Sequence, residues 1–198
     1  RAAKPDALSG KFVILSVGRY SVEKRQDILI EAVKRSKYSS QIQLIFAGQG
    51  PRKNQYMRQA KGLKNSAIFK FMSQQELIRT MNFCDLYVHT ADSEVEGMSA
   101  LEAISCGLVP VISNSGKSST KVFALDDRSI FNAGDPESLK ARIDYWISHN
   151  DERARMGIEY SCFAKKYSVE RSAERLENMF MTACGEEYGI EEEALQRS

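Results

Sequence analysis

The chain has few of the residues that build metal sites or disulfide frameworks. Its four cysteines are widely and irregularly spaced, and only two histidines, His89 and His149, are available to join them. No zinc-binding spacing results. Long apolar runs are also missing, since none approaches the roughly 18 residues of a membrane-spanning helix. These absences predict reduced thiols in a cytoplasmic protein that has no metal site of its own.

Neither sign of charge dominates the sequence. The 28 lysines and arginines nearly balance the 26 aspartates and glutamates, which leaves a net charge of +2. Such a balance gives no broad field that would attract nucleic acid or an anionic membrane as the main partner. We therefore expect no nucleic-acid partner, and any anion site must be local.

Length and composition indicate one globular domain. A chain of 198 residues that is 42% hydrophobic and 27% charged suits a single core. Residues 1–10 are small and polar and are broken by Pro5 and Gly10, which predicts a linker or tail. Residues 185–198 are acidic with few apolar anchors, which predicts a disordered tail. The folded domain is expected to span residues 11–184.

Short apolar runs alternate with amphipathic segments along this domain. Continuous apolar runs are typical of strands buried on both faces of a parallel sheet. The sequence therefore predicts the α/β class, with a doubly wound, Rossmann-like parallel sheet followed by C-terminal helices. Ligands bind such sheets at the carboxyl ends of the strands. The predicted strands are 12–17, 42–47, 68–71, 86–90, 108–112 and 129–131, and the predicted helices are 22–37, 52–63, 74–83, 98–104, 136–149, 151–167 and 169–184.

The stretch EVEGMSALEAISCG at residues 94–107 directly follows the predicted strand 86–90. Gly97 lies just outside the N-terminus of the expected helix, where free backbone N–H groups and the helix dipole favour an anion. Glu94 and Glu102 have seven residues between them. Because carboxylates only accept hydrogen bonds, they suit sugar hydroxyls on either side of a phosphate. The alternative is that both are ordinary solvated charges.

Two cations, Arg19 and Lys24, lie in the loop after the first predicted strand. An arginine offers a planar fork to phosphate oxygens and a lysine a mobile point charge. Together with a helix N-terminus they can hold a diphosphate without a metal, and the chain has no Asp-x-Asp pair for Mg²⁺. The alternative is that both cations are solvated. The segment GQGP at residues 48–51 is either a plain turn or a close approach of backbone to ligand.

The order of GRYSVEK, FAGQGP and FCDLYVHTADSEVEGMSALEAISCGLVPVIS resembles the donor-binding half of retaining glycosyltransferases of the GT-B fold. The family is glycosyltransferase family 4, also called group 1, and the resemblance spans roughly residues 11–183. It is strongest in the glutamate motif and in the loop that carries Arg19 and Lys24.

One helix, residues 169–184, has an apolar face that is either core or exposed.

The resemblance implies a role for each motif. Arg19 and Lys24 would hold the donor's diphosphate, and Glu94 would hold the transferred sugar's hydroxyls near the anomeric carbon, which makes these three the expected catalytic residues. Glu102 would take the ribose hydroxyls. The other implied donor contacts come from the glycine loops, the nucleobase segment and the start of the helix: Gly18, Gly48, Gly50, Phe71, Met72, Gly97, Met98 and Ser99.

The resemblance also implies an activity and partners. The enzyme would transfer a hexosyl group from a UDP-, GDP- or ADP-linked sugar to a hydroxyl acceptor, with retained configuration and without metal or cofactor. Acceptors in the family are often glycans or lipid-linked, in polysaccharide or glycolipid assembly, so the full-length protein is expected in the cytoplasm or at the inner membrane face. An acceptor domain would precede residue 1, and this chain alone is expected to bind donor but transfer little.

Departures from the family pattern leave the sugar open. Glu96 replaces an aromatic, Thr90 stands near a usual proline, and the loop 114–120 lacks a common glutamate. Two other functions remain as alternatives: a nucleotide-sugar epimerase or hydrolase, and a non-catalytic nucleotide-binding module. The first needs an acid or base, but we expect His89 to be a structural histidine with satisfied ring nitrogens, and Cys106 to be a packing residue.

Overall fold

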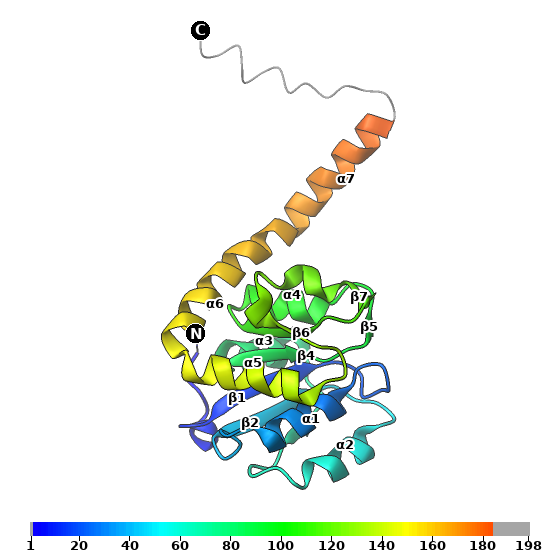
Figure 1. Ribbon diagram of the computed structural model, residues 1–198. Coiled ribbons are helices and arrows are strands. Elements are labelled where there is room, and N and C mark those ends of the chain that lie inside the picture. The colour runs from blue at the N-terminus through cyan, green and yellow to red at the C-terminus, as the bar shows by residue number, and fades with distance from the viewer. Residues whose placement is uncertain (1, 184–198) are drawn as a thin grey trace. The chain divides into compact units, whose positions relative to one another are not determined.

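The computed structural model describes residues 2–183 and forms two compact units, with the boundary between Cys162 and Phe163. The first unit contains a six-stranded sheet in the order β3-β2-β1-β4-β6-β8 (Figure 1). Every neighbouring pair in it is parallel. This confirms the predicted doubly wound, Rossmann-like α/β fold. The six strands are β1 (Phe12–Val17), β2 (Ile42–Ala47), β3 (Ile68–Lys70), β4 (Leu86–His89), β6 (Val109–Ser113) and β8 (Ile130–Phe131).

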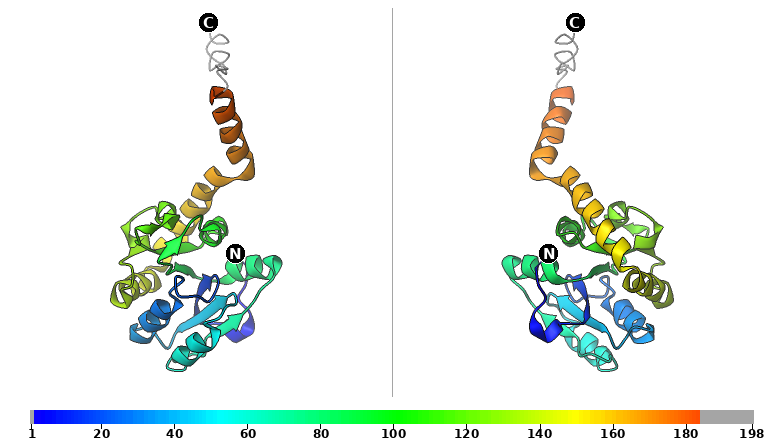
Figure 2. Two further views of the ribbon diagram at one scale, coloured as in Figure 1. Left: turned by 90° about the vertical axis from the view of Figure 1, so that its right-hand side faces the viewer. Right: turned by 90° about the vertical axis from the view of Figure 1, so that its left-hand side faces the viewer.

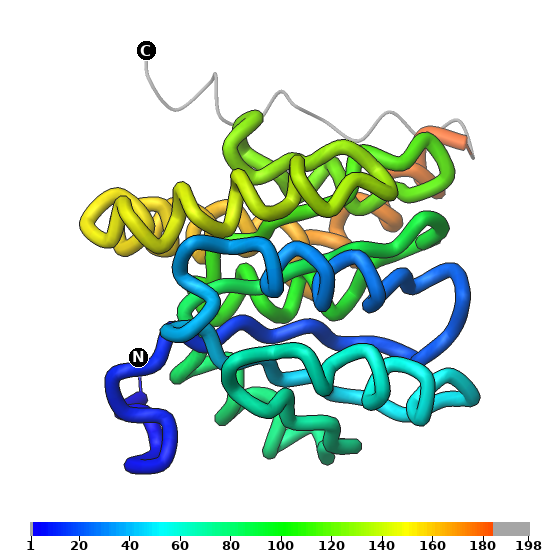
Figure 3. Tube along the Cα trace, turned by 60° about the horizontal axis from the view of Figure 1, so that its bottom comes forward, coloured from blue at the N-terminus to red at the C-terminus, as the bar shows by residue number. Residues whose placement is uncertain are grey.

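Helices cover both faces of the sheet (Figure 2). On one face α5, α1 and α2 lie side by side (Figure 3), and α1 contacts both of its neighbours. On the other face α4 packs against β4 and β6. The helices are α1 (Gln26–Arg35), α2 (Lys53–Ala60), α3 (Gln74–Phe83), α4 (Met98–Ser105), α5 (Pro136–Ser148), α6 (Asn150–Ala164) and α7 (Val169–Ala183).

The central strands form the core because their apolar runs are covered on both faces. Val13, Ile14 and Leu15 of β1 are completely buried. Strand β1 pairs with β2 over its full length, from Phe12 opposite Ile42 to Val17 opposite Ala47. Burial of such side chains is the main stabilising contribution to a sheet of this kind.

Helix ends follow the expected capping chemistry in two places. Ser73 and Glu76 form the predicted capping box of α3, with the Ser73 side chain accepting from the Glu76 N–H. Gly97 precedes α4 with φ +67° and Gly107 follows it with φ +75°, both in the left-handed region that glycine tolerates. Helix α4 therefore begins where the glutamate motif predicts.

The helix predicted from residue 22 begins later, at Gln26. Residues 18–25 instead form a long loop, and Arg25, with φ +49°, is left-handed immediately before α1. A second difference is a small parallel sheet of β5 (Ser93–Glu94) and β7 (Lys117–Ser118). Two-residue strands with polar side chains give no apolar alternation, so no periodic pattern announces them.

The segment predicted as an N-terminal linker makes specific contacts. The Ala2 N–H donates to the Asn82 carbonyl at 3.1 Å, and Lys4 Nζ is 2.5 Å from Asp85 Oδ2. Leu8 is buried. The predicted tail at residues 185–198 lies outside the described residues.

The described part of the chain has no helix that is both long and apolar enough to cross a membrane. In the second unit, helix α7 has no buried residue. Its apolar side chains Leu176, Met179 and Phe180 are all exposed.

Candidate functional site

Loops from three neighbouring strands enclose a cavity of about 640 Å³ at the carboxyl edge of the sheet. They follow β1, β2 and β3, which is the edge where a doubly wound sheet binds ligands. Six of its lining residues were predicted as donor-binding: Gly18, Arg19, Gly48, Gly50, Phe71 and Met72. The others, which no motif marks, are Val17, Ala47, Gln49 and Leu77.

Two glycines let the first and second loops touch. A Cβ atom added to Gly48 would lie 2.0 Å from the Gly18 carbonyl oxygen, and one added to Gly50 would lie 2.5 Å from the Tyr20 carbonyl oxygen. The Tyr20 N–H donates to the Gln49 carbonyl at 3.0 Å. The GQGP segment is therefore more than a plain turn, because its glycines allow backbone to pack on backbone and shape one wall of the cavity.

The cavity lining combines apolar side chains with a charged one. Phe71 is 64% exposed and lies beside Met72 and Leu77, which gives an apolar surface suited to a flat ring. Arg19, in the loop after β1, is exposed, and its carbonyl accepts from Gln26 Nε2 at 3.0 Å. An apolar slot beside a cation matches a base linked to a phosphate.

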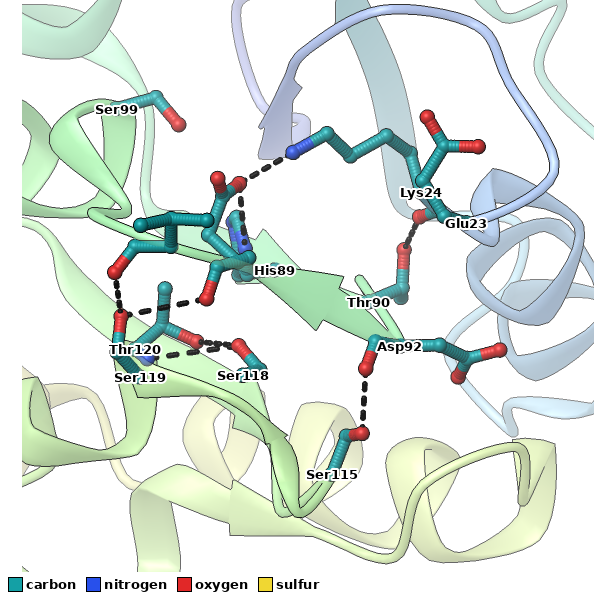
Figure 4. A network of polar contacts seen from close by, with 12 residues as sticks. Glu23, Lys24, His89, Thr90, Asp92, Ser99, Ser115, Ser118, Ser119 and Thr120 are labelled. Atoms are coloured by element: carbon teal, nitrogen blue, oxygen red, sulfur yellow. Dashed lines mark hydrogen bonds and ion pairs between the residues drawn. The ribbon is translucent and has the colours of Figure 1, made fainter.

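Lys24 contacts the first glutamate of the motif directly. Its Nζ donates to Glu94 Oε2, and both side chains are about four-fifths buried. The Lys24 backbone is held as well, because the Thr90 hydroxyl donates to its carbonyl at 2.7 Å, and Arg25 Nη1 is 2.9 Å from Asp92 Oδ2. Figure 4 shows Lys24 extending from its loop towards His89 of β4.

The small β5–β7 sheet fixes Glu94. Glu94 lies opposite Ser118 in the parallel register, and the Ser119 hydroxyl donates to the Val95 carbonyl. Figure 4 shows Ser118, Ser119 and Thr120 gathered beneath this segment. Gly97 is required next, because a Cβ there would lie 2.2 Å from Thr120 Cγ2. The turn between Glu94 and α4 is therefore tightly determined.

A buried polar chain connects Glu94 with the start of α4. His89 Nε2 is 3.5 Å from Glu94 Oε2, and His89 Nδ1 is 3.1 Å from the Tyr87 hydroxyl. That hydroxyl is 2.9 Å from Ser99 Oγ. This series of polar contacts runs from Lys24 through Glu94, His89 and Tyr87 to Ser99. The sequence does not predict this series of contacts, because polar contacts between side chains of different elements follow no sequence period.

Burial keeps His89 and Tyr87, in the middle of this series of contacts, uncharged. It lowers the pKa of His89 to about 4, with Lys24 acting in the same direction and Glu94 opposing both. Burial likewise raises the pKa of the Tyr87 hydroxyl, and the charges of Glu94 and Glu102 raise it further. His89 is therefore neutral near pH 7. The expectation that both of its ring nitrogens are satisfied is wrong, because Nε2 has no hydrogen-bond partner within usual distance.

Helix α4 presents free donors at its start. The first N–H group bonded within the helix is that of Ala100, which donates to the Gly97 carbonyl at 2.8 Å. The N–H groups of Met98 and Ser99 precede it and are the ones available to an anion. Glu102 is one turn into α4 and half-buried. Among the described residues, no group of three or more His, Cys, Asp or Glu side chains is placed to hold a metal ion.

The predicted site residues thus fall into two neighbouring groups. One lines the cavity, and the other is the Lys24–Glu94 pair with the start of α4. Met98 belongs to the second group through its N–H group, and its side chain is 53% exposed. Cys106 lies at the C-terminal end of α4, at the opposite end of that helix from the N–H groups of Met98 and Ser99.

The chain is similar to known glycosyltransferases in both sequence and structure. Residues 2–160 match the family described as "Glycosyl transferases group 1". The catalytic domain of cholesterol-alpha-glucosyltransferase from Helicobacter pylori is 45% identical, with a TM-score of 0.77, over 79% of this chain and 99% of that one. Anabaena Alr3699/HepE in complex with UDP-glucose shares the fold at 21% identity, with a TM-score of 0.78, over 89% of this chain and 50% of that one.

Curated relatives are longer than this chain. Alpha-monoglucosyldiacylglycerol synthase of Streptococcus pneumoniae is 31% identical over 53% of the chain and 24% of its own length. Sulfoquinovosyl transferase SQD2 of Arabidopsis thaliana is 25% identical over 85% of the chain and 33% of its own length. This chain therefore spans a quarter to a third of these two relatives. The family match covers most of its residues, and the chain belongs to the group 1 glycosyltransferases.

Proposed function

We propose that this chain is the donor-binding domain of a retaining hexosyltransferase that uses a UDP-sugar. The observation that carries the proposal is the meeting of Lys24 and Glu94 beside the free N–H groups of α4. A cation, N–H groups that suit an anion and a carboxylate that accepts hydrogen bonds from hydroxyls would then belong to one cluster, which supports the proposal. The UDP and UDP-glucose complexes of fold neighbours favour uracil among the three possible bases.

In the proposed reaction, charge develops on the diphosphate as the bond from the sugar's anomeric carbon to the phosphate oxygen breaks. Arg19, Lys24 and the N–H groups of Met98 and Ser99 stabilise this charge most strongly in the transition state. No metal is required, because two cations and a helix terminus supply the opposite charge. Glu94 orients the hydroxyls of the transferred sugar.

Glu102 has a separate proposed task on the other side of the phosphate. Its carboxylate accepts hydrogen bonds from the ribose hydroxyls of the donor. The base lies in the apolar slot formed by Phe71, Met72 and Leu77. The predicted alternative of an acid–base epimerase is disfavoured by His89, because a buried imidazole with a pKa lowered to about 4 is a weak base near pH 7.

We further propose a lipid hydroxyl as the acceptor of the whole protein, in glycolipid assembly. The support is the similarity to proteins whose names specify cholesterol and diacylglycerol glycosylation. Positioning of a second substrate contributes much of the rate of a two-substrate reaction. We therefore expect the chain of 198 residues to bind donor and to transfer little by itself.

Isothermal titration with UDP, GDP and ADP, with and without Mg²⁺, tests the proposal. We expect UDP to bind without metal, and we expect both Lys24→Ala and Glu102→Ala to weaken it about tenfold. Lys166→Ala and Glu159→Ala, which change exposed residues on α6 and just after it, serve as controls. Preference for GDP or ADP overturns the choice of base, and failure of all three nucleotides to bind at millimolar concentration overturns the donor site.

A further inference from the structure

Basic residues are concentrated in one part of the chain. Residues 32–75 contain nine lysines and arginines and no aspartate or glutamate. The rest of the chain contains 19 basic and 26 acidic residues. The small net charge therefore conceals a strong separation of charge along the sequence.

The fold gathers part of this charge on the outer face of α2. Tyr56 and Ala60 are buried against the domain, while Lys53, Arg58 and Lys61 are exposed. Arg58 and Lys61 are three residues apart and lie on one side of the helix, whereas Lys53 is in its first turn. Met57, 45% exposed, is four residues before Lys61 and lies on the same side.

The turn after α2 continues the basic surface. Lys61 and Lys64 are exposed in it, and Lys11 reaches it by donating to Asn65 Oδ1 at 3.0 Å. Lys34 of α1 also approaches this turn, at Gly62, but is paired with Glu31 at 2.7 Å. We define the α2 cationic surface as Lys11, Arg58, Lys61 and Lys64.

The position of this surface leaves the donor site open. Helix α2 starts at the carboxyl edge of the sheet, where the cavity lies, and ends in the turn that leads to β3. That turn is at the amino edge of the sheet, as is Lys11 directly before β1. A partner bound to the end of α2 would therefore not cover the cavity.

We propose that the α2 cationic surface docks on an anionic lipid bilayer, an interaction that goes beyond the proposed transfer reaction. Clusters of four or more Lys and Arg side chains bind anionic headgroups by charge complementarity. Met57 suits a membrane in addition, because an apolar side chain among cations can enter the headgroup region. Nucleic acid fits less well, since no aromatic side chain on this face is exposed for stacking on bases.

Co-sedimentation of the full chain with vesicles tests the proposal. Phosphatidylcholine vesicles with and without phosphatidylglycerol are compared at low and high salt. We expect binding only to the anionic vesicles, with loss at high salt. The triple variant Arg58→Gln/Lys61→Gln/Lys64→Gln should bind about 10- to 100-fold more weakly.

A matched triple variant, Arg155→Gln/Lys165→Gln/Lys166→Gln, removes the same charge from exposed residues on and after α6 and should bind vesicles like the unchanged protein. Unchanged UDP titration by both variants shows that the fold is intact. Equal losses in the two variants, equal binding to neutral vesicles, or stronger binding to single-stranded RNA than to anionic vesicles overturns the proposal. UDP binding stays a separate readout, so failure here leaves the donor site unaffected.

Discussion

Lys24 and Glu94 neutralise each other in this structure, although the proposed donor needs both charges. A diphosphate would draw the Lys24 ammonium away from the Glu94 carboxylate, or would share it. Binding of donor therefore competes with an ion pair that is already formed. The strength of this competition can be measured by removing the negative partner.

We predict that Glu94→Gln binds UDP about 2- to 5-fold more tightly, because Lys24 is then free for the diphosphate and a partly exposed ion pair contributes up to about 1 kcal/mol. The same variant should lose the advantage of UDP-glucose over UDP, since Glu94 is proposed to hold the sugar. Parallel titrations with the two ligands measure both effects. Glu96→Gln, at an exposed residue two positions away, is the control, and weaker UDP binding by Glu94→Gln contradicts the prediction.

His89 makes a prediction about pH. In the unfolded chain its pKa is near the ordinary value of 6.5, while in the fold burial lowers it to about 4. Between these values the unfolded chain binds the extra proton, so the free energy of unfolding falls as pH falls from 6.5 to 4. We expect His89 to account for about 2 to 3 kcal/mol of this loss.

Denaturant unfolding at pH 7 and pH 4.5 measures that contribution. The difference in stability between the two pH values should be smaller in His89→Gln than in the unchanged protein. His149→Gln, which replaces the other and exposed histidine, should behave like the unchanged protein. If His89→Gln and the unchanged protein lose the same stability, then burial does not hold His89 neutral.

At the scale of elements, the link between β5 and α4 depends on one glycine. An alanine at Gly97 would need a left-handed backbone and would place its Cβ 2.2 Å from Thr120 Cγ2. We predict that Gly97→Ala lowers the free energy of unfolding by about 2 to 4 kcal/mol. Adding Thr120→Ser removes the Cγ2 atom and should restore part of the loss, because the backbone strain alone remains.

Chemical denaturation measures these differences. Gly116→Ala is a matched control, since a Cβ there meets nothing within 4 Å, and it should change stability by less than about 0.5 kcal/mol. An additive effect of Gly97→Ala and Thr120→Ser, without recovery, would mean that the turn relaxes around the new Cβ.

Elements with a repeating apolar pattern could be predicted from the sequence, and elements without one could not. The run Phe12–Val17 predicted β1 with its observed bounds, and Ser73 with Glu76 predicted the cap of α3. The β5–β7 pair could not be predicted because it has two polar residues in each strand. Polar site residues also lack an apolar pattern, so Arg19, Lys24 and Glu94 could be identified only from motifs. The contacts of His89 and Tyr87 belong to no motif and could be seen only in the fold.

At the scale of the whole molecule, stability is unevenly distributed between the two units. The first contains the sheet and its buried side chains, and residues of α6 belong to that core. Met156 and Tyr160 are buried, and the Tyr160 hydroxyl donates to Ser129 Oγ at 2.7 Å. Helix α7 has no buried residue, so it adds little apolar burial to the free energy of folding.

We predict that deletion of residues 169–198 changes the free energy of unfolding by less than about 1 kcal/mol, because none of the described residues that it removes, 169–183, is buried. UDP affinity should stay within about twofold, since the cavity and the Lys24–Glu94 pair keep all of their contacts.

Deletion from residue 156 onward is the contrasting variant. It removes Met156 and Tyr160, and loss of two large buried side chains costs about 4 kcal/mol or more. Thermal unfolding and UDP titration of both truncated chains decide the matter: if the shorter deletion destabilises the protein as strongly as the longer one, α7 contributes to the stability of the first unit.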